Sequence, residues 1–284
     1  MTTREKPARP QGTGRLRRGL GAAVLAVILL AAVPAGAGVI KLSTTVGVAR
    51  VAGKPVLQLT LVNRGDDSAH DLEITASLGR HQVVRPGPAR LAPNTSARLE
   101  VPLPAGPATP GDYPVLITVV FHNAHGHRFS NIAVGIFSRG APAANPLRVR
   151  GQDAAITTIG KMRFRLASST PHALAVTTRV FTPFEFAAAD PRQELRLAGP
   201  GQRRLAVELR NRSAFDHASY PVFLIAEFDH QGRHYTSLAS ALVSVRPQGD
   251  PMAPWRAPLA AAAALLLLII IGAQLMPGRA RQGI

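Results

Sequence analysis

Three histidines at one predicted turn form the first feature of this sequence whose residue types suggest chemistry. His122, His125 and His127 occur together in the stretch FHNAHGHRF, between two apolar segments. Imidazole nitrogens are common ligands of Zn²⁺ and Cu²⁺, so three of them around a hairpin predict a candidate metal site. Histidine also suits a polar hairpin tip, and the sequence reveals no fourth ligand. We therefore expect no cofactor, with Zn or Cu as the alternative that this turn leaves open.

A second candidate is a row of three cations, Lys161, Arg163 and Arg165, that alternates with apolar residues. Successive side chains of a β-strand point to opposite faces, so the three cations share one face. This pattern predicts an outward basic stripe that suits an anionic partner. The alternatives are an ordinary solvated strand face, or an edge strand whose charges prevent pairing with another chain.

Catalytic motifs are missing from the sequence. It contains no Gly-x-Ser-x-Gly, no His-Glu-x-x-His, no phosphate loop and no dinucleotide-binding fingerprint. It also contains no cysteine, which excludes disulfides and thiolate catalysis. We therefore expect a protein that is not an enzyme.

The elements that would hold these residues are β-strands. Leucines 57, 59 and 61 alternate with polar residues, as expected for a strand with one face in a core and one in water. Turn residues such as Asn63-Arg64-Gly65-Asp66 and Pro110-Gly111-Asp112 separate the runs. The adhesion tripeptide Arg64-Gly65-Asp66 is explained fully by such a turn. The same alternation recurs in residues 72–75, 98–103, 161–166 and 204–209.

The sequence repeats itself between its two ends. Leu91–Val101 matches Leu197–Val207 at an offset of 106, and Tyr113-Pro114-Val115 matches Tyr220-Pro221-Val222 at 107. About seven strands in roughly 100 residues are typical of an immunoglobulin-like sandwich. The prediction is an all-β protein with two tandem immunoglobulin-like β-sandwiches, module 1 (39–140) and module 2 (147–247). The short linker 141–146 contains two prolines, so it should restrict their relative orientation.

Module 1 resembles a known family of bacterial repeats. Val62-Asn63-Arg64-Gly65, Leu91-Ala92-Pro93-Asn94 and Gly111-Asp112-Tyr113 are similar to motifs of the immunoglobulin-like NEW3 and CARDB modules. Tyr113, and Tyr220 in the second copy, resemble a tyrosine corner, with a strand-starting tyrosine as the equal alternative. The resemblance implies stalks, spacers or adhesive and ligand-binding units, and it carries over no functional residue.

Both ends of the chain predict a membrane location. Leu259–Met276 has no charge and would cover about 27 Å as a helix, nearly the thickness of a hydrocarbon core. Residues 1–37 read as a signal peptide with the apolar core Leu20–Val33, or as an uncleaved anchor. The expected order is therefore a signal segment, two modules, a stem (248–258), one transmembrane helix (259–276) and a cytoplasmic tail (277–284).

The charge of +17 completes the sequence-based prediction. An exported, membrane-anchored domain rarely meets nucleic acid, so an anionic surface or polymer of the envelope is the expected counter-charge. We expect a non-enzymatic single-span protein of the cell (inner) membrane, with its modules outside. These modules would dock an envelope protein or an anionic polymer. The alternatives are a metal- or glycan-binding ectodomain, or an assembly factor that acts by strand addition.

Overall fold

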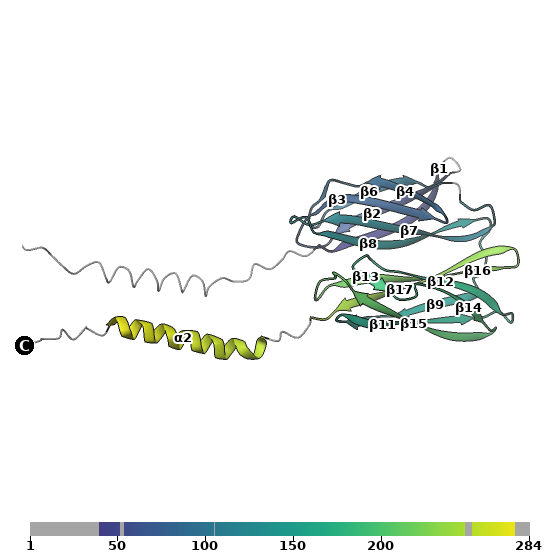
Figure 1. Cartoon of the computed structure of the whole chain (residues 1–284). Coiled ribbons are helices and arrows are strands. Elements are labelled where there is room, and N and C mark those ends of the chain that lie inside the picture. Colours follow the sequence, from purple (N-terminus) through teal and green to yellow (C-terminus); the bar gives the residue numbers. More distant parts are fainter. Residues whose placement is uncertain (1–39, 52–53, 105, 248–251, 276–284) are drawn as a thin grey trace, which may run out of the picture. The chain divides into compact units, whose positions relative to one another are not determined.

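The computed structural model describes residues 40–51, 54–104, 106–247 and 252–275 (Figure 1). Residues 38–248 form one compact unit, and helix α2 (Ala253–Leu275) belongs to a second one. The predicted signal segment (1–37) and cytoplasmic tail (277–284) lie outside the described residues. The compact unit consists of β-strands, which confirms the all-β prediction.

The described residues of module 1 form eight strands in two sheets, and the second sheet continues into module 2 as one ten-stranded sheet. One sheet has the order β1-β2-β6, and in the other β7 pairs with β8 and β3, which in turn pairs with β4 and β5. The alternating leucines of β2 are fully buried, as predicted. The strands are β1 (Leu42–Val51), β2 (Lys54–Asn63), β3 (Ala69–Leu78), β4 (His81–Pro86), β5 (Arg90–Leu91), β6 (Ser96–Pro102), β7 (Gly111–His122) and β8 (Arg128–Arg139).

Module 2 repeats this plan with nine strands. One sheet has the order β13-β15-β11-β9, and the other has β14-β12-β16-β17 with β10 added beside β17. The strands are β9 (Leu147–Gln152), β10 (Ala154–Ile156), β11 (Ile159–Ser168), β12 (Leu174–Phe181), β13 (Phe186–Ala188), β14 (Arg192–Leu197), β15 (Gly201–Asn211), β16 (Ser219–His230) and β17 (Arg233–Val245).

Each module encloses its own hydrophobic core. Inward side chains of both sheets make up each core, because apolar residues alternate with polar ones along the strands. Phe121 in module 1 and Phe228 in module 2 occupy repeat-related positions, and both are buried. The internal repeat in the sequence therefore corresponds to two separate cores.

The turn residues behave as the sequence predicted. Asn63 is fully buried, and its side-chain amide donates to the carbonyls of Asp67 and Leu91 while its oxygen accepts from Gly65 N. This network accounts for the Arg64-Gly65-Asp66 tripeptide as part of a turn. Tyr113 Oη donates to the carbonyl of Thr109, four residues upstream, at 2.8 Å, which is the geometry of a tyrosine corner.

Tyr220 makes a related but different contact. Its hydroxyl accepts a hydrogen bond from the Phe215 amide, five residues upstream, at 3.1 Å. Each tyrosine therefore ties the start of its strand to the preceding loop, through a carbonyl in module 1 and an amide in module 2.

The two modules run antiparallel, side by side. β8 is antiparallel to β7, and β7 pairs in parallel with β17 through His234 and Gly111. The last strands of the two modules, β8 and β17, therefore run in opposite directions. We call the end of the compact unit at the linker the apex and the opposite end, where β1 begins and β17 ends, the base. The linker thus reverses the chain at the apex.

Helix α2 (Ala253–Leu275) overlaps the predicted span but begins six residues before it, within the predicted stem. It includes Trp255 and Pro258. Among the described residues, no helix combines the length and hydropathy required to cross a membrane.

Candidate functional site

The basic stripe predicted from the sequence lies on β11. Lys161, Arg163 and Arg165 are all exposed, while the residues between them, Met162 and Phe164, are buried in the core of module 2. The alternation thus gives the three cations a common outward face. β11 lies between β9 and β15, so it is not an edge strand, and edge protection does not explain its charges.

The neighbouring strands extend this stripe into a basic face. Arg165 lies directly opposite Arg150 on β9 and Arg204 on β15. Adjacent strands are about 4.8 Å apart, so the three arginines form a row across the sheet. We call this set the arginine row. The sequence alone showed only its middle member.

Seven basic residues and one acidic residue, Glu208, lie on the outward side of this sheet. Within the described ranges, none of the seven forms a hydrogen bond, an ion pair or a ring contact through its side chain. Glu208 is the register partner of Lys161 but makes no ion pair with it. The basic face consists of Arg148, Arg150, Lys161, Arg163, Arg165, Arg204 and Arg210.

The electrostatic repulsion within the arginine row indicates that this surface can bind anions. Like charges directly opposite each other on neighbouring strands destabilise a sheet. A bound anion removes that repulsion and gains charge-assisted hydrogen bonds from guanidinium groups. The row can therefore hold phosphate or carboxylate groups, and a flat sheet face can contact several at once.

A shallow pocket of about 220 Å³ adjoins the row. Its lining includes the cations Lys161 and Arg163 and the polar residues Gln152 and Asp153. The Asp153 carboxylate accepts a hydrogen bond from Leu242 N at 2.8 Å, so it is held toward β17. The pocket leaves room beside the two cations for an anionic group.

The predicted metal ligands His122, His125 and His127 do not form one cluster in the described structure. Among the described residues, no group of three or more histidine, cysteine or acidic side chains is placed to hold a metal ion. The rings of His125 and His127 are 6.4 Å apart, and both side chains are exposed. Asn123 Oδ1 accepts from the amides of both, so the turn is organised by an asparagine.

His122 is separate from the other two histidines in its surroundings. Its Nδ1 is buried and has no hydrogen-bond partner among the described residues. It lies on β7 opposite His70 of β3 and Arg128 of β8. His122 therefore differs in environment from His125 and His127, and Zn or Cu binding remains a prediction from the sequence.

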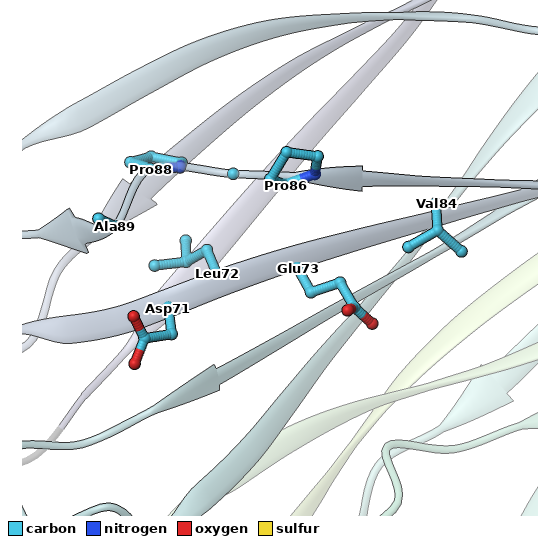
Figure 2. Close-up of a pocket in the computed structure, with 8 residues that line it drawn as sticks. Asp71, Leu72, Glu73, Val84, Pro86, Pro88 and Ala89 are labelled. Atoms are coloured by element: carbon cyan, nitrogen blue, oxygen red, sulfur yellow. The ribbon is translucent and has the colours of Figure 1, made fainter.

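A second shallow pocket, of about 430 Å³, lies where β3 and β4 separate (Figure 2). Asp71 and Glu73 lie on one side, with Pro86 and Pro88 on the facing segment. No basic or nucleophilic side chain lines this pocket. We therefore assign it no chemistry.

Sequence reasoning missed a buried acid at the junction between the modules. Glu185 is 1% exposed and accepts hydrogen bonds from Ser130 N (2.8 Å) and Ser130 Oγ (2.7 Å). Burial raises the pKa of its carboxyl above 4.5, and the bonds from Ser130 only partly oppose this. Its position between two aromatic residues, Phe184 and Phe186, was the available signal, because an apolar stretch favours burial of its neighbours.

A second ionisable group lies at the apex side of the junction. The His234 ring stacks on Tyr113 with ring centroids 4.6 Å apart. Its Nε2 lies 3.4 Å from Glu227 Oε1, and its Nδ1 lies 2.8 Å from Asp229 Oδ1. The hydrogen bond to Glu227 raises the pKa of His234 above 6.5, against the effect of burial. Burial raises the pKa of Glu227, but hydrogen bonds from His234 and Arg179 outweigh it and lower the net value.

Comparison with known proteins identifies no relative. No protein-family model matches the chain, and no curated protein matches it. Solved structures with similar parts include red sea bream transglutaminase (12% identity, TM-score 0.26), covering 73% of this chain and 31% of the enzyme. For Salmonella alpha-2-macroglobulin (9% identity, TM-score 0.31), the match covers 73% of this chain and 16% of the other. For the E. coli chaperone DraB (14% identity, TM-score 0.27), the match covers 36% of this chain and 54% of the other.

Proposed function

We propose that this protein is a non-enzymatic, membrane-anchored protein of the cell envelope whose second module binds an anionic envelope polymer through its basic face. The observation that carries the proposal is the arginine row, Arg150, Arg165 and Arg204, in which three cations lie opposite one another without a carboxylate partner. An acidic protein surface is the second candidate occupant.

The residue types favour an extended polyanion. Arginine presents a rigid fork of donors that matches phosphate and carboxylate oxygens, whereas lysine acts as a point charge. Six of the seven basic side chains on the face are arginines. They lie on an open sheet surface, where successive anionic groups of one chain can each meet a guanidinium group.

The proposed location rests on the sequence. Leu259–Met276 contains no charged residue, which favours a membrane span. The predicted signal segment (1–37) lies outside the described residues, so it too is argued from the sequence alone. Helix α2 covers most of the apolar stretch. We infer a single C-terminal anchor, with the modules on the side of the membrane where envelope polymers lie.

The strand order supports an immunoglobulin-like assignment for both modules. In each, the first, second and fifth strands of six or more residues share one sheet, and the other strands of that length form the second sheet. This order corresponds to the A-B-E and C-F-G sheets of an immunoglobulin sandwich. Together with the Asn-x-Gly and Gly-x-Tyr motifs, it favours modules of the NEW3 and CARDB kind.

The test is a binding titration with the full chain in lipid nanodiscs. The probes are a polyphosphate chain, a polyglutamate chain of matched charge, and uncharged dextran. The variant R150T/R165T/R204T removes the row. The control K54T/R85T/R98T removes the same net charge from exposed positions in module 1.

We expect the row variant to lose about 100-fold in affinity for at least one polyanion, and the control to lose less than about 3-fold. The reason is that direct contacts between guanidinium groups and anions contribute more binding free energy than the screened, long-range attraction of the net charge. Equal losses in the two variants would show that net charge alone attracts polyanions, and would refute the proposed face. Binding of dextran by the native chain would favour a glycan site instead.

A further inference from the structure

The base of the compact unit is built from four segments of module 2 that hydrogen bonds join. Arg246 N donates to the Ile156 carbonyl (2.7 Å), and Asn211 N donates to the Thr158 carbonyl (2.8 Å). Arg212 N donates to the Glu185 carbonyl at 2.8 Å, and His217 N to the Val245 carbonyl at 2.9 Å. The loops 156–159, 182–186 and 211–218 and the end of β17 therefore form one continuous surface.

Module 1 contributes to the same end. Ser130, near the start of β8, bonds to Glu185, and the Phe129 ring lies 5.3 Å from the Phe215 ring. The next residue, Asn131, donates to the carbonyl of Leu42, the first residue of β1. The chain thus enters and leaves the compact unit at the base, whereas the linker lies at the apex.

The connection to helix α2 is short. Eight peptide steps separate Val245, the last residue of β17, from Ala253, the first of α2. Such a stretch reaches at most roughly 28 Å. If the helix anchors the chain, the base is therefore the end of the unit that is held near the bilayer.

Large apolar side chains are exposed at this end. Ile159, Phe184 and Phe215 are 49%, 37% and 53% exposed. The two phenylalanines are held in place, because Phe215 contacts Phe129 and the Arg128 guanidinium lies 5.2 Å above the Phe184 ring. Exposed aromatic side chains in fixed positions cost solvation free energy unless a partner covers them.

Basic side chains surround these apolar residues. Exposed cations at the base outnumber the acids, which include Asp216 beside Phe215 and Asp66 and Asp67 in the Asn63 turn. Aromatic tips among arginines match the two parts of a lipid interface, the upper acyl region and the anionic headgroups. The cations are Lys41, Arg64, Arg128, Arg210, Arg212 and Arg246.

We propose that the base is a lipid-contact surface that rests on the anionic headgroups of the anchoring membrane. Phe184 and Phe215 insert at the interface, and the surrounding arginines bind headgroup phosphates. This inference rests on the proposed membrane anchor. It gives the ectodomain a fixed orientation, with the apex farthest from the bilayer and the strands of the basic face running away from it.

The chain contains no cysteine, so a single introduced cysteine can carry a fluorescent label without background. S213C places the label on an exposed base residue next to Phe215, and A143C places it on the exposed linker at the apex. Each full-length variant is reconstituted in vesicles with and without anionic lipid. A nitroxide-labelled headgroup lipid then quenches any label close to the surface.

We expect quenching at Ser213 to exceed that at Ala143 by at least about threefold in anionic vesicles, and to weaken in zwitterionic vesicles. Adding F184S/F215S to the S213C variant should remove most of the difference. Equal quenching at both sites, in protein that floats with the vesicles, would overturn the inference and leave the base to a protein partner.

Flotation separates this result from failure of the proposed function. Protein that does not float with vesicles at alkaline pH lacks the proposed anchor, and both proposals then fail together. Protein that floats but shows no quenching at Ser213 retains its anchor and refutes only the lipid contact.

Discussion

The same cross-strand row exists in both modules, with different residues. In module 1, Thr45, Thr60 and Arg98 lie opposite one another on β1, β2 and β6. In module 2, Arg150, Arg165 and Arg204 lie opposite one another on the corresponding strands β9, β11 and β15, and Arg204 is the repeat partner of Arg98 at an offset of 106.

A threonine pair on neighbouring strands favours the sheet, whereas an arginine pair opposes it. The fold therefore does not require the arginines, since module 1 is built without two of them. We attribute the difference to binding by module 2, and module 1 becomes the natural control for that role.

The largest expected effect is transfer of the row from one module to the other. Within R150T/R165T/R204T, which loses about 100-fold in polyanion affinity, T45R/T60R should recover at least about 10-fold, because it completes the same row beside Arg98. The measurement is the titration in nanodiscs. Failure to recover affinity would mean that the row needs the adjoining pocket of module 2.

The turns that follow β2 in module 1 and β11 in module 2 should show a smaller effect, on stability. Asn63 makes three hydrogen bonds in a buried site, so N63A should lower the free energy of unfolding by about 2 kcal/mol. In module 2, Thr170 Oγ1 accepts one bond of 3.3 Å from His172 N, so T170A should cost only about 0.5 kcal/mol.

Urea unfolding of the two variants, compared with the native chain, measures both costs. A similar loss in the two variants would mean that the two turns contribute equally, despite their different hydrogen bonding.

The junction should make stability depend on pH. A raised folded pKa means that Glu185 contributes full stability below its unfolded value of 4.5 and loses it as pH rises through the folded value. His234 behaves in the same direction, from 6.5 upward, because its folded pKa is also raised. Glu227, with a lowered pKa, contributes stability above 4.5 that is lost as pH falls.

We therefore expect stability to fall as pH rises above 4.5 and to fall further above 6.5, and E185Q to reduce that fall by on the order of 1 kcal/mol. The amide keeps an acceptor for Ser130 N without a buried charge. E194Q, at an exposed position, is the matched control. Identical pH profiles for E185Q and the native chain would assign the dependence to His234 alone.

The smallest effect concerns the loss of stability that like-charge repulsion within the arginine row causes. R165T should raise the free energy of unfolding by about 0.5 kcal/mol at low salt, since it removes two like-charge contacts, and the gain should vanish at high salt. The reciprocal change T60R should lower stability by a similar amount. Thermal denaturation in both salt conditions checks this pair, and a stabilising T60R would contradict the repulsion argument.

Several features of this protein were fixed by the local sequence. The alternation around Leu59 and Phe164 predicted strands and their buried faces, because the period of a strand is set by backbone geometry. The Asn63 turn and the Tyr113 corner were recognisable, since their hydrogen bonds join residues close together in the sequence. The basic stripe of Lys161, Arg163 and Arg165 was predicted from the same strand periodicity.

Only the tertiary structure decided the rest. Arg150, Arg165 and Arg204 meet because strand register places residues 15 and 39 positions apart side by side, and register depends on the whole sheet. Glu185 is buried because Ser130 of the other module lies against it. The chain reverses at the linker, which places Leu42 and Val245 at one end, because contact between β7 and β17 orients the two cores.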